Sequence, residues 1–411
     1  MKSFFWAISL LMGGVAFAQQ DLQDQINQLK AELEHLKRAP MDVPPHRETE
    51  NPIHKKFNVF FNFQSSFDAV TPKNGETELG FKARQLRLEI RGDINERIFY
   101  RFRHRLNRTN EAASLDNLSR ATDIMYAGFR FNDKFSLTLG KMCQAWGGFE
   151  FDLNPMNIYE YSDMVDNMDN FMLGGMLTFS PNKNHEFNFQ ITDVHNKSFA
   201  DTYGTVPNVQ ASKAPLTYIF NWNGNFFRNN LLQTRWAIGF QNEAKNHTNA
   251  MYTFGTKLNF SKFQVFLDYM NADEELDRLK YTPLSNSQVL KNVTYDTFIL
   301  KAEYQPIEKI NIFVKGMYET AKNSIVNNER TSLGYYTGVE YLPFKDQDLR
   351  FFLAYIGRES EIKNGLKDCS NLNCHDIESS FIKSEQFKMS RSKTQTVSIF
   401  SKICYISIFI I

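Results

Sequence analysis

The chain contains little cysteine, and its placement is uneven. Only four cysteines occur in 411 residues, and three of them follow residue 360. A disulfide framework distributes cysteines through the domain that it braces, so we expect none here. Cys369, Cys374 and His375 fit no standard spacing of metal ligands, and we therefore expect neither a metal site nor a cofactor.

Long apolar runs are absent after the first eighteen residues, and so is any excess of charge. Without an apolar stretch of about 18 residues, helical membrane spans are excluded. The formal net charge is +1, so the chain has no global field that would recruit an anionic partner. It also lacks the glycine loops that cradle phosphates and the basic–aromatic patterns that bind nucleic acid, so no nucleic-acid partner is expected.

Aromatic residues, by contrast, are abundant. The chain has 38 Phe and 17 Tyr, and aromatics make up 14% of it, although the mean hydropathy is only −0.44. This combination is typical of strands whose side chains alternate between lipid and water. A large secreted β protein shares it, so composition leaves both classes open.

The N-terminus predicts a secretory signal peptide over residues 1–18. Lys2 supplies the positive start, an apolar run follows, and Ala16 and Ala18 form the small-x-small cleavage pattern. The apolar run is too short to serve as a membrane anchor. We therefore expect the protein to leave the cytoplasm of a bacterial cell.

A short coiled coil is predicted over residues 19–38, and a proline-rich linker over 39–56. The apolar positions of the first segment are spaced alternately by four and three, the heptad seam of a coiled coil: Leu22, Ile26, Leu29, Leu33 and Leu36. A lone helix of this length is marginal in water, so the seam indicates an oligomer.

From Phe57 onward the dominant pattern is alternation with a period of two residues, which predicts strands. Most have eight to twelve residues, which suits tilted membrane strands of about 9–11. The fifteen predicted strands cover residues 57–68, 81–91, 97–108, 121–131, 135–142, 171–180, 186–194, 216–223, 231–241, 251–260, 263–270, 294–304, 310–320, 332–342 and 349–358.

The connections between these strands alternate between short and long. The predicted long ones are 69–80, 109–120, 143–170, 195–215, 242–250, 271–293 and 321–331. This meander is typical of a transmembrane antiparallel β-barrel, and such barrels normally have an even number of strands. We therefore predict an all-β barrel of about sixteen strands, with fifteen of them in residues 57–358. A soluble β-sandwich fits the alternation of connections less well.

The expected sixteenth strand falls in an anomalous C-terminal segment, residues 359–411. Its sequence TVSIFSKICYISIFII is apolar on both faces, so the row of polar side chains that faces the lumen is missing. The segment is interpreted either as altered, frameshifted coding sequence or as an atypical closing strand.

Two neighbouring strands place arginines on one face. In the sequence RLEIRGDINERIFYRFRHR, successive side chains point to opposite sides of each strand. The apolar side chains then share one face, and the other face carries the candidate pore-lining residues Arg87, Arg91, Arg97, Arg101, Arg103 and Arg105. Their planar guanidinium groups pair with phosphate or carboxylate oxygens. The alternative is that they pair with acids and only shape the wall.

The longest predicted connection between these strands, residues 143–170, is the candidate constriction loop. Its aromatic residues would wedge it inside the barrel, and Gly147 and Gly148 allow a tight fold. The candidate constriction residues are Trp146, Phe149, Glu150, Asp152, Tyr159 and Glu160. If the loop acids face the arginines, they create the transverse field of a general diffusion pore. If they point elsewhere, the pore is anion-selective. An exposed surface loop is the third interpretation.

Two segments, FKARQLRLEIRGDINERIFYRFR and LTLGKMCQAWGGFEF, together with the predicted signal peptide, coiled coil and linker, carry a family resemblance. The chain resembles the phosphate-selective porin O and P family in the form common among Bacteroidetes. The resemblance implies a homotrimeric outer-membrane porin, embedded in outer-membrane lipid, whose arginine and lysine ladders pass small anions such as phosphate.

We therefore predict a passive porin of the Gram-negative outer membrane that passes small anions, including phosphate, along its arginine face. One alternative is a non-selective diffusion porin in which the loop acids neutralise the arginines. Another is a lipase-like barrel enzyme. That enzyme would need a serine–histidine pair on the outer wall, and His104 has no serine that can be assigned to it from the sequence.

Overall fold

The computed structural model describes residues 56–72, 75–111, 116–278, 291–323, 328–344, 349–363 and, as main chain only, 396–408. These residues belong to one compact unit, Ile53–Ile411. The predicted signal peptide, the coiled coil and nearly all of the linker lie outside the described residues.

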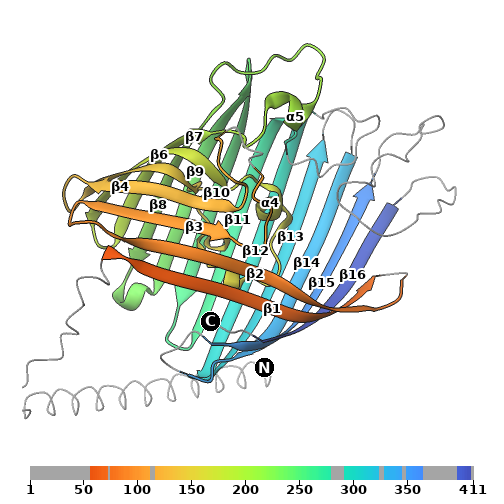
Figure 1. Cartoon of the computed structure of the whole chain (residues 1–411). Coiled ribbons are helices and arrows are strands. Elements are labelled where there is room, and N and C mark those ends of the chain that lie inside the picture. Colours follow the sequence, from red (N-terminus) through yellow and green to blue (C-terminus); the bar gives the residue numbers. More distant parts are fainter. Residues whose placement is uncertain are drawn as a thin grey trace, which may run out of the picture. The chain divides into compact units, whose positions relative to one another are not determined.

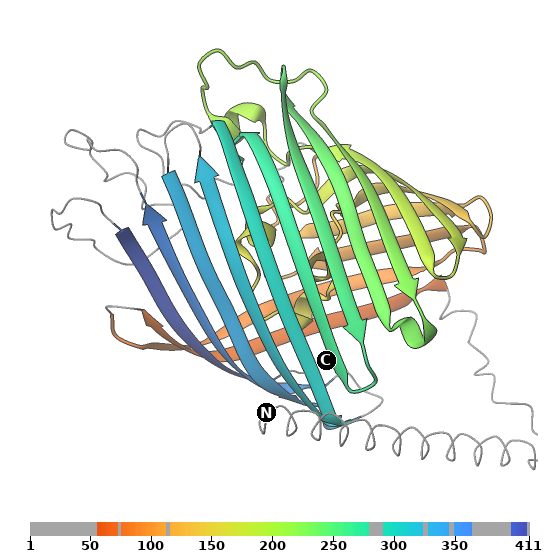
Figure 2. The same cartoon turned by 180° about the vertical axis from the view of Figure 1, so that it is seen from behind.

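Fifteen antiparallel strands form one continuous sheet in which each strand pairs with the next in sequence (Figures 1 and 2). Their bounds are β1 Asn58–Pro72, β2 Glu78–Asp93, β3 Ile98–Arg105, β4 Thr122–Arg130, β5 Phe135–Cys143, β6 Phe171–Asn182, β7 His185–Asp193, β8 Leu216–Phe226, β9 Leu232–Ala244, β10 His247–Asn259, β11 Phe263–Leu276, β12 Lys291–Ile307, β13 Ile310–Asn323, β14 Asn328–Tyr341 and β15 Phe351–Lys363. All fifteen predicted strands are confirmed.

A further strand, β16 (Thr396–Ile408), joins the two edges of this sheet. It pairs antiparallel with β15 over its whole length, and it also pairs with β1, where Phe67 lies opposite Ile406. The strand order thereby returns to its starting point and forms a ring.

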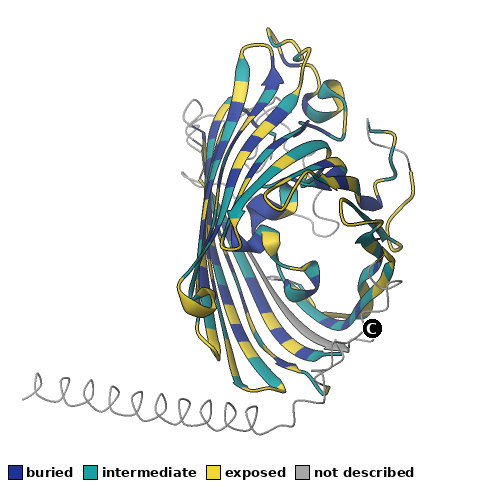
Figure 3. Ribbon diagram, turned by 90° about the vertical axis from the view of Figure 1, so that its left-hand side faces the viewer, coloured by how far each residue is buried: buried dark blue, intermediate teal, exposed yellow. Residues whose placement is uncertain are grey.

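The strands expose apolar side chains outward and enclose mixed polar side chains. In β13, Ile312, Val314 and Tyr318 are exposed, whereas Lys315 and Glu319 are buried. Figure 3 shows the resulting alternation of buried and exposed positions along the strands. Because a soluble protein normally has the opposite arrangement, the outer face of this ring suits lipid.

Three connections predicted to be long are short in the structure. The predicted loop 242–250 shrinks to residues 245–246, because β9 runs to Ala244 and β10 begins at His247. Likewise β1 and β2 are separated only by 73–77, and β13 and β14 only by 324–327. The strands extend through polar residues beyond the aromatic segments, where the apolar alternation used for prediction ends.

The short helices lie in two of the remaining long connections and in one turn. The β5–β6 loop, residues 144–170, contains α3 (Phe149–Asp152), η1 (Pro155–Asn157) and α4 (Asp163–Asn167). The β7–β8 loop contains α5 (Phe199–Tyr203), and the β8–β9 turn contains η2 (Arg228–Asn230). Within the described part of the chain, no helix is both long and apolar enough to span a membrane.

Candidate functional site

The predicted arginine face exists and is built by the pairing of β2 with β3. In this register Arg87 lies opposite Arg105, and Arg91 lies opposite Arg101. Arg103 lies opposite Glu89. We call the set Arg87, Arg91, Arg101, Arg103 and Arg105 the arginine wall. Arg97, predicted to belong to the same face, is instead exposed in the turn before β3, because the strand begins only at Ile98.

Two carboxylates neutralise part of the arginine wall. Glu89 accepts two hydrogen bonds from Arg101, at 3.0 and 3.2 Å, and lies 3.6 Å from Arg91. Asp123, on β4, pairs with Arg105 at 2.7 Å and with Arg103 at 3.3 Å. Five guanidinium groups therefore face two carboxylates within this cluster.

Arg87 differs from the rest of the arginine wall. Its residue is only 3% exposed, its Nε has no hydrogen-bond partner, and it forms no ion pair with any described residue. A guanidinium group that is enclosed and unpaired is costly unless a mobile anion or water supplies the missing partner. Arg87 is therefore the member of the wall whose charge no carboxylate of the described residues balances.

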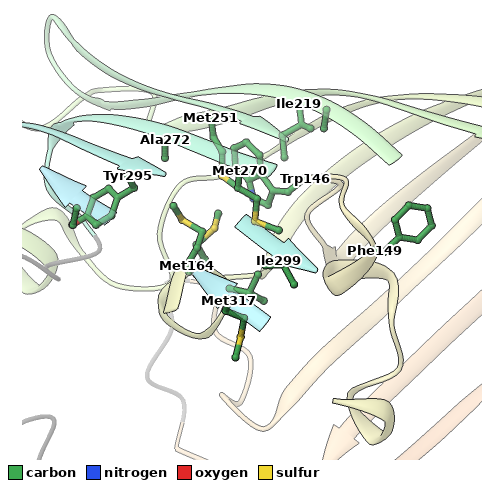
Figure 4. Packing of buried hydrophobic residues seen from close by; sticks show 14 of the residues in the cluster. Trp146, Phe149, Met164, Ile219, Met251, Met270, Ala272, Tyr295, Ile299 and Met317 are labelled. Carbon is green, nitrogen blue, oxygen red and sulfur yellow. The ribbon is translucent and has the colours of Figure 1, made fainter. Parts of the chain in front are cut away.

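The β5–β6 loop folds inward and packs on the far part of the ring. Trp146 is fully buried in a cluster with Ile219, Met251 and Met270, and Figure 4 shows this packing. Gly239 makes room for the indole, since a Cβ there would lie 2.3 Å from the Cζ3 atom of Trp146. The interpretation of the segment as an exposed surface loop is therefore wrong.

Positive φ angles at Gly147 (71°) and Gly148 (76°) turn the chain after Trp146. Farther along the loop, the ring of Tyr159 stacks on Phe313 with centroids 4.6 Å apart. Its hydroxyl donates to Glu340 at 2.5 Å. The aromatic residues thus hold the loop at two places on the inner wall.

Two buried strand carboxylates bind the main chain of the loop. Asp268, on β11, accepts hydrogen bonds from the N–H groups of Phe149 at 2.9 Å and Glu150 at 2.8 Å. Glu319, on β13, accepts from Asp163 at 2.8 Å and Met164 at 3.0 Å. These N–H groups begin α3 and α4 and have no partner within the helices. The two acids therefore fix where each short helix starts.

The acidic side chains of the loop pair with cations of the wall on which the loop packs. Arg235 lies 2.7 Å from Asp152, and Arg358 lies 3.1 Å from Glu160. Lys315 pairs with Glu150, and both Arg330 and Arg358 pair with Asp163. These four carboxylates are therefore engaged on β9 and β13–β15 and do not pair with the arginine wall on β2 and β3.

Two loop acids, Asp166 and Asp169, remain exposed and form no ion pair with any described residue. Although Asp166 is exposed, desolvation by the surrounding protein raises the pKa of its carboxyl group, and the neighbouring Glu150 raises it further, while Arg108 lowers it. Burial raises the pKa of Tyr161, on the same loop, to about 12, and Arg87 acts in the opposite direction.

Comparison of sequences identifies the family. A family model described as phosphate-selective porin O and P matches residues 57–374. The chain belongs to the phosphate-selective porin O and P family. It is therefore an outer-membrane channel of a Gram-negative bacterium and not an enzyme. A search of curated proteins finds no match.

Solved structures support the porin fold. The outer-membrane channel DcaP of Acinetobacter baumannii is 9% identical with a TM-score of 0.54, over 85% of this chain and 96% of that one. OmpF of Salmonella typhi, in a complex with daunomycin, is 11% identical with a TM-score of 0.52, over 86% of this chain and 97% of that one. At these identities the likeness concerns the fold alone.

Sequence reasoning missed the residues of this porin that receive the loop. These residues are Asp268, Lys315, Glu319 and Arg358. It also missed Asp123, which pairs with the arginine wall and not with the loop. Alternation places Lys315 and Glu319 on one face of the predicted strand 310–320, so their shared direction could be predicted from the sequence. Their partners in the loop could not be predicted, because Glu319 and Asp163 are 156 residues apart in sequence.

Proposed function

We propose that this porin forms a sixteen-stranded, water-filled channel through which small anions, including phosphate, diffuse along the arginine wall. One observation carries the proposal. Four acids of the constriction loop are paired with cations on the strands behind the loop, while the arginine wall keeps five guanidinium groups against two carboxylates.

The physical basis is partial neutralisation. A channel must bind a permeant ion strongly enough to admit it and weakly enough to release it. Arg101, Arg103 and Arg105 already share carboxylate partners, so they attract an anion weakly, whereas Arg87 has no such partner. The guanidinium groups at successive positions along the wall would then act as a series of weak binding sites for phosphate oxygens.

Closure of the barrel and the assembly of the porin are part of the same proposal. We assign the closing strand to Thr396–Ile408, since its main chain pairs with both β15 and β1. The barrel then comprises residues 57–408, and an atypical closing strand replaces the interpretation of a frameshifted tail. We also propose a homotrimer. The heptad seam of residues 19–38 predicts an oligomer, and the number of three copies is taken by analogy with other porins.

The test is the reversal potential of purified porin in planar bilayers across a KCl gradient, followed by block of the chloride current with phosphate. The arginine wall predicts preference for chloride. At roughly 6 Å in water, one charge contributes about 0.7 kcal/mol, or about threefold in anion binding. Arg87→Ala is therefore expected to weaken phosphate block about threefold.

Lys309→Ala is the matched control, because Lys309 is an exposed cation in the turn between β12 and β13. It should leave both the reversal potential and the block unchanged. Preference for potassium in the unmodified porin, or phosphate block that is insensitive to Arg87→Ala, would overturn the proposal.

A non-selective diffusion porin is the second candidate, and a specific observation favours it. Glu89 and Asp123 contact four of the five guanidinium groups of the arginine wall. If these pairs screen the wall fully, chloride and potassium will pass in proportion to their mobilities, and the reversal potential will lie near zero.

A further inference from the structure

An apolar groove of about 510 Å³ lies on the outer face of the barrel, across β6 to β10. Its walls are mainly aromatic, and the residues that define it here are Phe187, Phe220, Trp222, Trp236 and Phe254. Phe220 is 53% exposed, so these rings face the surroundings of the barrel and not its lumen.

The rings of the groove form a continuous row because they occupy paired positions on successive strands. Phe187 lies opposite Trp222, Trp222 opposite Trp236, and Trp236 opposite Phe254. The centroids along this row are 6.2, 5.4 and 5.6 Å apart. The first of these contacts is stacked and the other two are edge-to-face. Both arrangements are favourable for aromatic pairs, so the contacts hold the rings of the groove in place.

The row lies near the end of the barrel that carries the short turns. Phe187 is the third residue of β7, Trp222 is four residues from the end of β8, and Trp236 is the fifth residue of β9. At about 3.3 Å per residue, the rings are within roughly 15 Å of the strand ends. Short turns of outer-membrane barrels face the periplasm, so the groove lies in the periplasmic leaflet.

The short turns at the periplasmic strand ends next to the groove are cationic. Along the arc from β4 to β11 the short turns carry Lys134, Lys183, Arg228 and Lys262 against a single acid, Asp133. All four cations are exposed, and none forms an ion pair with a described residue. An apolar groove thus ends at a rim of unpaired positive charge.

We propose that this groove and its rim bind an anionic phospholipid of the periplasmic leaflet. One acyl chain lies in the groove against Trp222 and Trp236, and the phosphate of the headgroup contacts Lys183 and Arg228. The argument is charge complementarity at the membrane surface, where each Lys or Arg attracts anionic lipid. The site depends on the outer-membrane location and not on the ion that the channel passes.

The tryptophans of the groove supply the assay. The chain has four tryptophans, of which Trp6 lies in the predicted signal peptide and Trp146 in the loop. In a Trp146→Phe variant of the mature porin, the fluorescence comes from Trp222 and Trp236. This variant is reconstituted in phosphatidylcholine vesicles that contain an equal minor fraction of either brominated phosphatidylglycerol or brominated phosphatidylcholine, since bromine quenches tryptophan on contact.

We expect brominated phosphatidylglycerol to quench several-fold more than brominated phosphatidylcholine. In Lys183→Ala/Arg228→Ala this preference should fall about fivefold for each cation removed. Lys309→Ala, whose turn lies on another part of the ring, should retain it. An ordinary aromatic belt contacts every lipid alike. Equal quenching by the two lipids, or a preference that survives the double substitution in folded porin, would therefore overturn the site.

Discussion

Glu319→Gln should release part of the constriction loop and change single-channel conductance. The buried carboxylate accepts the N–H groups of Asp163 and Met164, at 2.8 and 3.0 Å, and the hydroxyl of Thr297 at 3.1 Å. The glutamine side chain keeps one oxygen as an acceptor, but an NH2 group replaces the other oxygen. This NH2 group is a donor and would face one of the main-chain N–H groups.

The size of the effect follows from the lost bond. A hydrogen bond to a charged group contributes about 1.5–3 kcal/mol. The substitution should therefore shift the equilibrium between docked and released loop by roughly ten- to a hundredfold toward release. We propose that the docked loop narrows the lumen, so its release should widen the channel. Recordings in planar bilayers should show a larger conductance level and transitions between two levels.

The control for this substitution is Glu329→Gln, which removes a carboxylate from a partly exposed position on β14. It should leave the conductance unchanged. Both variants are first checked for folding by the shift in electrophoretic mobility on heating. A folded Glu319→Gln porin with a single conductance level equal to that of the parent would refute the role assigned to Glu319.

Three further results are expected. Gly239→Ala should expel Trp146 and raise the conductance, because the new Cβ would lie 2.3 Å from the indole. Gly80→Ala is the control, since a Cβ there meets no atom within 4 Å. Equal conductance of the two variants would contradict this packing. Acidification should increase the preference for chloride from a pH above the ordinary carboxyl range, since the pKa of Asp166 is raised and protonation removes its negative charge. That step should vanish in Asp166→Asn. Ending the chain after Lys363 removes β16 and its pairs with β1 and β15, so no heat-modifiable barrel should form.

The strands were predictable because lipid outside and water inside impose alternation at each position. This constraint acts locally, which is why all fifteen strands of the predicted meander are present in the structure. The alternation disappears where the strand is surrounded by water on both faces. The end of β9 and the beginning of β10 were for this reason predicted to be part of a long loop. Alternation also could not assign β16, whose sequence is apolar on both faces.

The candidate site was predictable only in part. Alternation identified all five positions of the arginine wall on β2 and β3, and the aromatic content of the loop indicated that it folds inward. The direction of the loop acids depended on Arg235, Lys315 and Arg358, which lie 83 to 198 residues from the acids they pair with. No local pattern encodes such pairs.

The attachment of the loop to Asp268 and Glu319 also bears on biogenesis. Both anchors follow the loop in the chain, by 118 and 155 residues from its nearest bonded residue. The loop is therefore synthesised before its anchors, and it cannot take its final position until β11 and β13 are in place. A barrel that has not yet formed β11 and β13 would therefore lack the docked loop in its lumen. On the proposed function, such an incomplete barrel would be more permeable than the finished porin until assembly is complete.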